Sequence, residues 1–147
     1  MDPSRTIAVI EAALASGEHG FARRAAESVL REQPGHLAAQ VALARTLFAL
    51  GQPAVAVAQL MRVVQVDPED LGAWQVLADV REARGQRAEL INAAAAALAL
   101  SPRDSHLRAR VVALAGGTVP AWLNMAITAR LALDDGHYDE ARANTAQ

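Results

Sequence analysis

The chain has 147 residues, a formal charge of −2 and no cysteine. These features exclude a disulfide framework, a thiolate metal site and a cysteine nucleophile, and they offer no electrostatic attraction to nucleic acid or to an anionic membrane. Hydrophobic residues make up 52% of the sequence but aromatic residues only 3%, and this alanine-rich composition favours an all-α fold of closely packed helices over a β-sheet.

Two residue types that interrupt helices recur every 34 residues along the first two thirds of the chain. They are Gly17, Gly51 and Gly85, and Pro34, Pro68 and Pro102. A repeat of this length is typical of stacked helical hairpins. We therefore divide the chain into repeats 3–36, 37–70 and 71–104.

Each repeat begins with apolar residues at the spacing of one helix face. They are Ile7, Val9, Ile10 and Leu14, then Val41, Leu43, Leu47 and Phe48, then Trp74, Leu77 and Ala78. The glycine that follows suits the left-handed turn that ends a helix. Second helices are predicted over 20–33, 53–66 and 86–100, with Pro53 in a first turn.

The junctions between repeats combine a helix stop with a helix start. Residues 67–70 read Asp-Pro-Glu-Asp and residues 101–104 read Ser-Pro-Arg-Asp. The second junction has the spacing of a capping box that begins at Ser101, and acidic residues suit the positive end of the next helix.

The period is predicted to break after Pro102. Residues 105–114 can form a helix that Gly116 and Gly117 end early, and Gly136 opens a new glycine–aromatic–alanine pattern 51 residues after Gly85, one and a half repeats later. Either 105–114 is a spacer helix before a phase-shifted hairpin, or 121–134 is an unusual second helix and Tyr138 begins another unit. Residues 140–147 are expected to form a polar end.

The pattern resembles the tetratricopeptide repeat, W-x2-L-G-x2-Y, then G-x-Y-x2-A-x3-F-x2-A, then P. Matching residues are Trp74, Leu77, Ala78, Gly85, Ala97 and Pro102 in repeat three, Leu43, Ala44, Gly51, Ala56 and Pro68 in repeat two, and Gly17, Ala22 and Pro34 in repeat one. Departures are Ile10 and Leu90, where the family prefers a small residue, and Arg81, where it prefers an aromatic one. The resemblance implies one domain over 1–147, a right-handed superhelix of antiparallel helix–turn–helix repeats with an irregular segment over 105–147.

Residues for catalysis or metal binding are not arranged in any recognisable pattern. The four histidines, His19, His36, His106 and His137, have no ligand spacing. His19 is expected to be half-buried in packing and the others solvated in or beside turns. Carboxylates at 67–70 and 134–135 are explained by helix ends, and 116–118 lacks the lysine of a phosphate loop. We expect no catalytic residue, no metal and no cofactor.

The resemblance implies that the first helix of each repeat lines a concave, partner-binding face. The inward-facing residues would be Ile7, Glu11, Leu14, Val41, Arg45, Phe48, Gln75, Asp79 and Glu82. This face is apolar towards the N-terminus and acidic in repeat three, which suits an extended segment or an amphipathic helix with apolar anchors and a basic flank. Alternatively, Ile7 and Val41 pack between helices.

One function of the family is argued against. Its chaperone-binding members hold a C-terminal carboxylate with Lys, Asn and Arg side chains, and the corresponding positions here are Ile7, Glu11, Ala42, Gly72 and Val76. None supplies the required donor.

We therefore predict a non-enzymatic scaffold or adaptor that binds a protein or peptide, with no nucleic-acid or membrane partner. A cytoplasmic bacterial protein is expected, because the N-terminus lacks a signal peptide and the longest apolar run, 93–100, is too short to span a bilayer. Two alternatives stay open. The chain is an N-terminal regulatory or substrate-docking module of a larger bacterial enzyme, such as a glycosyl- or sulfotransferase, or it self-associates as a homo-oligomer through an exposed alanine face at 93–97.

Overall fold

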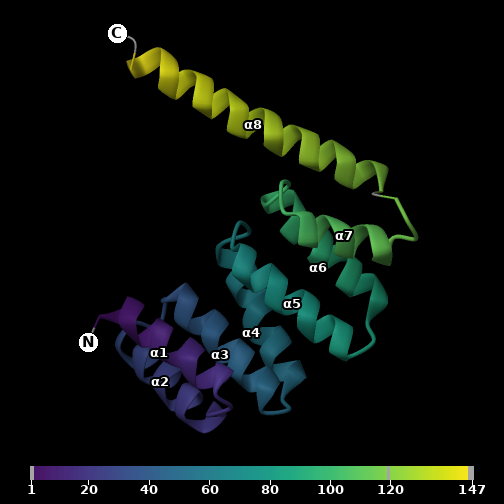
Figure 1. The fold of residues 1–147 in the computed structure, drawn as a ribbon. Coiled ribbons are helices and arrows are strands. Elements are labelled where there is room, and N and C mark those ends of the chain that lie inside the picture. The colour runs from purple at the N-terminus through teal and green to yellow at the C-terminus, as the bar shows by residue number, and fades with distance from the viewer. Residues whose placement is uncertain (1, 119, 146–147) are drawn as a thin grey trace. The chain divides into compact units, whose positions relative to one another are not determined.

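The structure, a computed structural model, describes residues 2–118 and 120–145, and beyond Asp134 only the backbone is considered. Every regular element in these ranges is an α-helix, which confirms the all-α prediction (Figure 1). The helices are α1 (Pro3–Ala15), α2 (His19–Glu32), α3 (Leu37–Ala49), α4 (Pro53–Val66), α5 (Leu71–Ala83), α6 (Arg87–Leu100), α7 (Ser105–Leu114) and α8 (Ala121–Thr145).

The helix starts repeat with one period along the whole chain. The first helices of the hairpins begin at residues 3, 37, 71 and 105, and the second helices begin at 19, 53, 87 and 121, so both series advance by 34 residues. The predicted half-repeat insertion after Pro102 is therefore wrong. The fourth hairpin is irregular in another way, since α7 has 10 residues where α1, α3 and α5 have 13, and a longer connection compensates for the difference.

The predicted glycine turns are present. Gly17, Gly51 and Gly85 have φ angles of 78°, 79° and 68°, a left-handed conformation that strains other residues. In the fourth hairpin Gly116 and Gly117, with φ of 83° and 109°, end α7 three residues earlier than the period predicts.

The first helix of each hairpin begins with a side-chain cap. Asp2, His36, Asp70 and Asp104, again 34 residues apart, each accept a hydrogen bond from a backbone N–H of the following helix. The second helices α2 and α4 have no such bond. His36 therefore has a capping role that the expectation of a solvated side chain missed, because its Nδ1 accepts from the Ala39 N–H at 3.1 Å.

The capping box predicted at Ser101 is wrong. The Ser101 N–H bonds to the carbonyl of Ala97, so Ser101 still closes the turn that ends α6. The cap lies three residues later, where the Asp104 carboxylate accepts from the N–H groups of His106 and Leu107. A carboxylate in this position also complements the positive end of α7.

Helix α8 continues beyond the point at which the other second helices stop. Those helices end just before Pro34, Pro68 and Pro102, and the corresponding residue of the fourth repeat is Gly136. Glycine costs a helix only about 1 kcal/mol and keeps its backbone N–H, whereas proline removes that donor. The predicted turn at Gly136, with a new unit from Tyr138, is therefore wrong. The predicted polar end-cap over 140–147 falls on side chains outside the described part.

The chain divides into two compact units, residues 1–87 and 88–147. In the first unit α1, α3 and α5 form one layer, because α3 contacts both of the others. Helix α2 contacts α1 and α3, and α4 contacts α3 and α5, so each second helix joins two successive first helices (Figure 1). This arrangement places equivalent positions of the first helices next to one another.

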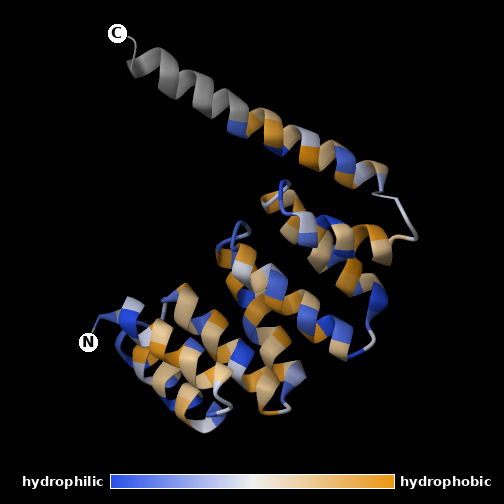
Figure 2. Ribbon diagram, viewed as in Figure 1, coloured by the Kyte–Doolittle hydropathy of each residue, from blue (hydrophilic) through white to orange (hydrophobic). Residues whose placement is uncertain are grey.

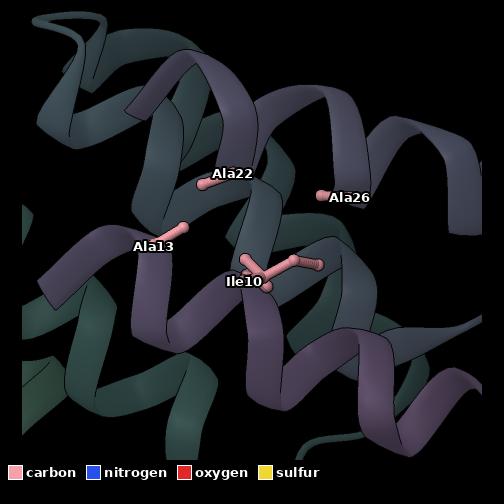
Figure 3. Close-up of a cluster of buried hydrophobic side chains, with 5 residues drawn as sticks. Ile10, Ala13, Ala22 and Ala26 are labelled. Atoms are coloured by element: carbon pink, nitrogen blue, oxygen red, sulfur yellow. The ribbon is translucent and has the colours of Figure 1, made fainter. Parts of the chain in front are cut away.

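The core of the first hairpin explains one departure from the repeat pattern. Ile10 is fully buried in a cluster with Ala13, Ala22, Ala26 and Ala42 (Figure 3). A large residue fits at this position because every buried neighbour in the cluster is an alanine.

In the second unit, the alanine run of α6 lies mostly inside. Ala93, Ala94, Ala95 and Ala97 are buried, and only Ala96 is partly exposed. The alternative of an exposed alanine face is therefore wrong. Leu90, the second departure from the pattern, is also buried. Further buried residues are Leu107 and Val111 in α7 and Leu123 and Ile127 in α8.

Candidate protein-interaction surface

The nine residues predicted to face a partner occupy equivalent positions in α1, α3 and α5. Because these helices form one layer, the residues fall into three rows that cross it. The rows are Ile7–Val41–Gln75, Glu11–Arg45–Asp79 and Leu14–Phe48–Glu82. We call this set the first-helix surface.

On the first-helix surface, exposure is highest in α5. Ile7 and Leu14 are partly exposed but also pack against the Ile10 cluster, and Phe48 is partly exposed. Asp79 and Glu82 are exposed. Val41 is only 8% exposed, which leaves little of its side chain for a partner and agrees with the alternative that it packs between helices.

An ion pair joins the first two helices in the middle row. The Arg45 Nη1 donates to the Glu11 Oε2, and the two side chains keep 41% and 43% of their surface exposed. Asp79 follows at the next equivalent position, so the row alternates in charge. A pair exposed to this degree contributes little to stability, about 0.2–1 kcal/mol. Its main effect is to fix opposite charges on the surface between α1 and α3.

A second surface, which the sequence analysis missed, lies on the side of α1 and α2. A groove of about 280 Å³ runs between Thr6 and Val9 of α1 and Phe21, Ala25 and Val29 of α2, and Glu32 lies at its end. Val9 is 46% exposed and Phe21 is 44% exposed. We call it the edge groove. The signal for it is the position of Val9, because its equivalents Leu77 and Val111 are buried and Leu43 packs against the core.

The remaining polar candidates have local roles. His19 is partly buried, as predicted, and its Nδ1 is buried with no hydrogen-bond partner among the described residues. His106 is exposed, and the side chain of His137 lies outside the described part. Arg81, the third departure from the pattern, donates from Nη1 to the Gln86 Oε1 at 2.6 Å.

The described residues contain neither a metal-binding cluster nor a membrane-crossing helix. No group of three or more acidic or histidine side chains there is placed to hold a metal ion. Among the described helices, none combines the length and apolar character that crossing a membrane requires.

Residues 13–80, from the end of α1 into α5, match the family model described as the tetratricopeptide repeat. This part of the chain has the tetratricopeptide-repeat pattern. Domains with this repeat are protein-interaction modules, and six of the nine residues of the first-helix surface lie within the matched range. No curated protein matches the chain in sequence.

Solved structures of other proteins share the fold. The first TPR domain of the human RPAP3 protein has 14% identity and a TM-score of 0.67, with 85% of this chain and 91% of that one covered. MamA 41-end from Desulfovibrio magneticus RS-1 has 20% identity and a TM-score of 0.64, covering 92% and 77%. The type III secretion translocator chaperone SycD of Yersinia enterocolitica has 12% identity and a TM-score of 0.62, covering 90% and 85%. At these identities the likeness extends to the fold alone.

Proposed function

We propose that this chain is a scaffold or adaptor that binds a segment of a partner protein on the first-helix surface. The observation that supports the proposal most is the layer formed by α1, α3 and α5, which aligns equivalent residues of three repeats in rows. Rows of this kind offer repeated contacts to an extended segment or to one face of a helix.

The chemistry of the rows suggests what the partner carries. Leu14 and Phe48 are partly exposed apolar side chains that can receive apolar anchors, and Asp79 and Glu82 form an acidic end. A basic flank on the partner would meet this acidic end and gain association rate and specificity. For one short segment we expect a dissociation constant on the order of micromolar, equivalent to about −8 kcal/mol.

The proposal is tested by capture from a lysate of the native organism with a double variant, Arg45→Glu with Phe48→Ala. The matched control is Met61→Ala with Arg62→Glu, which also truncates one apolar side chain and reverses one arginine charge, at exposed positions of α4 outside the first-helix surface. We expect the first variant to lose partners that the wild type and the control both capture, with unchanged helical circular dichroism. Equal capture by all three proteins would contradict the proposal.

A further inference from the structure

The α1 side of the edge groove occupies positions that are covered one repeat further along the chain, whereas Phe21 on α2 corresponds to Val55, which is 52% exposed. Val9 corresponds to Leu43, which packs against the Ile10 cluster of the first hairpin. Exposed Ala12 lines an adjoining hollow that shares Val9 and Phe21 with the groove, and it corresponds to Thr46, which is fully buried in α3. In the second repeat, therefore, a preceding helical hairpin covers this side of the first helix. The edge groove has the form of a site for a helix.

Helix α8 has an unpartnered apolar face of the matching kind. Trp122, Met125 and Leu133 are 55%, 74% and 58% exposed, and the exposed Ala126 and Ala129 lie between them at helical spacing. We call these five residues the outer stripe. Apolar residues recur along the described part of α8 in Figure 2.

The outer stripe is unusual for its place in the repeat. The positions of α2 equivalent to Met125, Ala126, Ala129 and Leu133 are Arg23, Arg24, Glu27 and Arg31. In α2 this face is charged, and Arg23 bonds to Glu27 at 2.9 Å across it. The equivalent face is charged and solvated in α2 but apolar in α8. An exposed apolar face of this kind indicates that a partner covers it.

We propose that the edge groove of one copy of this chain receives the outer stripe of α8 from a second copy. The two surfaces agree in length, because Phe21–Glu32 and Trp122–Leu133 each span eleven helical steps, about 16 Å. They agree in character, because Val9, Phe21 and Val29 offer an apolar floor to Trp122, Met125 and Leu133.

Groove and stripe are different surfaces, so the contact is heterologous. Each copy has one of each, and association either closes as a dimer with two equal contacts or extends as an open chain. A groove of about 280 Å³ supports only a small interface, so we expect association that depends on concentration rather than a permanent oligomer.

The proposal is tested by light scattering on the 147-residue chain over a concentration series. We expect the average mass of the wild type to rise with concentration. Phe21→Glu in the groove and Met125→Glu in the stripe should each weaken association by at least about tenfold, because a carboxylate would be buried without a partner. The matched control is Val66→Glu on α4, a residue that is 74% exposed like Met125 and lies in neither surface.

A mixture of the two variants gives the decisive result. The Phe21→Glu protein keeps its stripe and the Met125→Glu protein keeps its groove, so equal amounts should form a one-to-one dimer and nothing larger. This gain on mixing also shows that both variants are folded, and circular dichroism provides a second check. A wild type that stays monomeric, a variant that associates like the wild type, or a mixture without the dimer would each overturn the proposal.

Discussion

The first and fourth hairpins start in the same repeat register, but their second helices differ in length and in the character of their outer faces. Helices α2 and α8 begin at equivalent positions, 19 and 121, but α2 ends before Pro34 whereas α8 runs through Gly136 to Thr145. The outer face of α2 is charged, whereas that of α8 carries Trp122, Met125 and Leu133. The 34-residue period therefore determines where each second helix begins. A proline or a glycine at the end of the repeat determines where the helix stops, and the residues on its outer face determine what it can contact.

The largest effect is expected in the core of the first hairpin. Ile10→Ala should lower the free energy of unfolding by about 3–5 kcal/mol, because the surrounding alanines cannot move to fill the cavity. Val55→Ala, at a position of α4 that is 52% exposed, should cost less than about 1 kcal/mol. Urea unfolding followed by circular dichroism measures both. A loss below about 1 kcal/mol for Ile10→Ala would show that this core is not packed as described.

The difference in helix ends can be removed by one substitution. Gly136→Pro restores the residue type found at 34, 68 and 102, and it should end α8 near residue 135, since proline costs a helix interior about 3 kcal/mol. Far-ultraviolet circular dichroism should show the loss of helix. Gly136→Ala is the control and should strengthen the same segment by about 1 kcal/mol. Unchanged helicity in the proline variant would contradict the continuous α8.

Removing a side-chain cap from a first helix should lower stability by a smaller amount, in the third hairpin and in the fourth alike. Asp70→Ala and Asp104→Ala should each cost about 1 kcal/mol of stability, because each carboxylate accepts at least one helix N–H. Gln52→Ala, at the start of α4 where no side-chain cap is present, should have almost no effect. Thermal unfolding of the three variants compares them directly. Equal losses at all three positions would remove the distinction between first and second helices.

The smallest effect is expected at the Glu11–Arg45 pair. A double-mutant cycle with Glu11→Ala and Arg45→Ala should give a coupling energy of about 0.2–1 kcal/mol, because both side chains are more than 40% exposed. Chemical denaturation at low and high salt measures it, and salt should reduce it. A coupling well above 1 kcal/mol would assign the pair to the core rather than to the binding surface.

Most of the fold could be predicted from the sequence, because the glycines and prolines that end its helices act through local backbone conformation. A left-handed turn favours glycine and an X-Pro bond ends a helix, so Gly17, Gly51, Gly85 and the three prolines predicted the boundaries of α1 to α6 within a few residues. The same reasoning failed at Gly136. A glycine permits a turn but does not impose one, and no proline follows it to stop α8.

The sequence predicted which residues form the rows of the first-helix surface, but not how exposed each of their side chains is. Equivalent positions follow from the period, whereas the burial of Val41 depends on the neighbouring helices that cover it. The edge groove was missed because Phe21 and Val9 look like ordinary core residues in a helix-period pattern. Val9 is exposed because it lies in the first repeat with no described helix over it, whereas the position of Phe21 is also exposed in the second repeat, at Val55.

The role of the first-helix surface is tested most directly by site-specific photocrosslinking. A photoreactive residue is placed at Phe48 on α3 in one protein and at Met61 on α4 in another, both partly or largely exposed. The account predicts that the label at position 48 forms adducts with the partner and that the label at 61 does not. Adducts at position 61, or none at 48 while the partner is still captured, would contradict it.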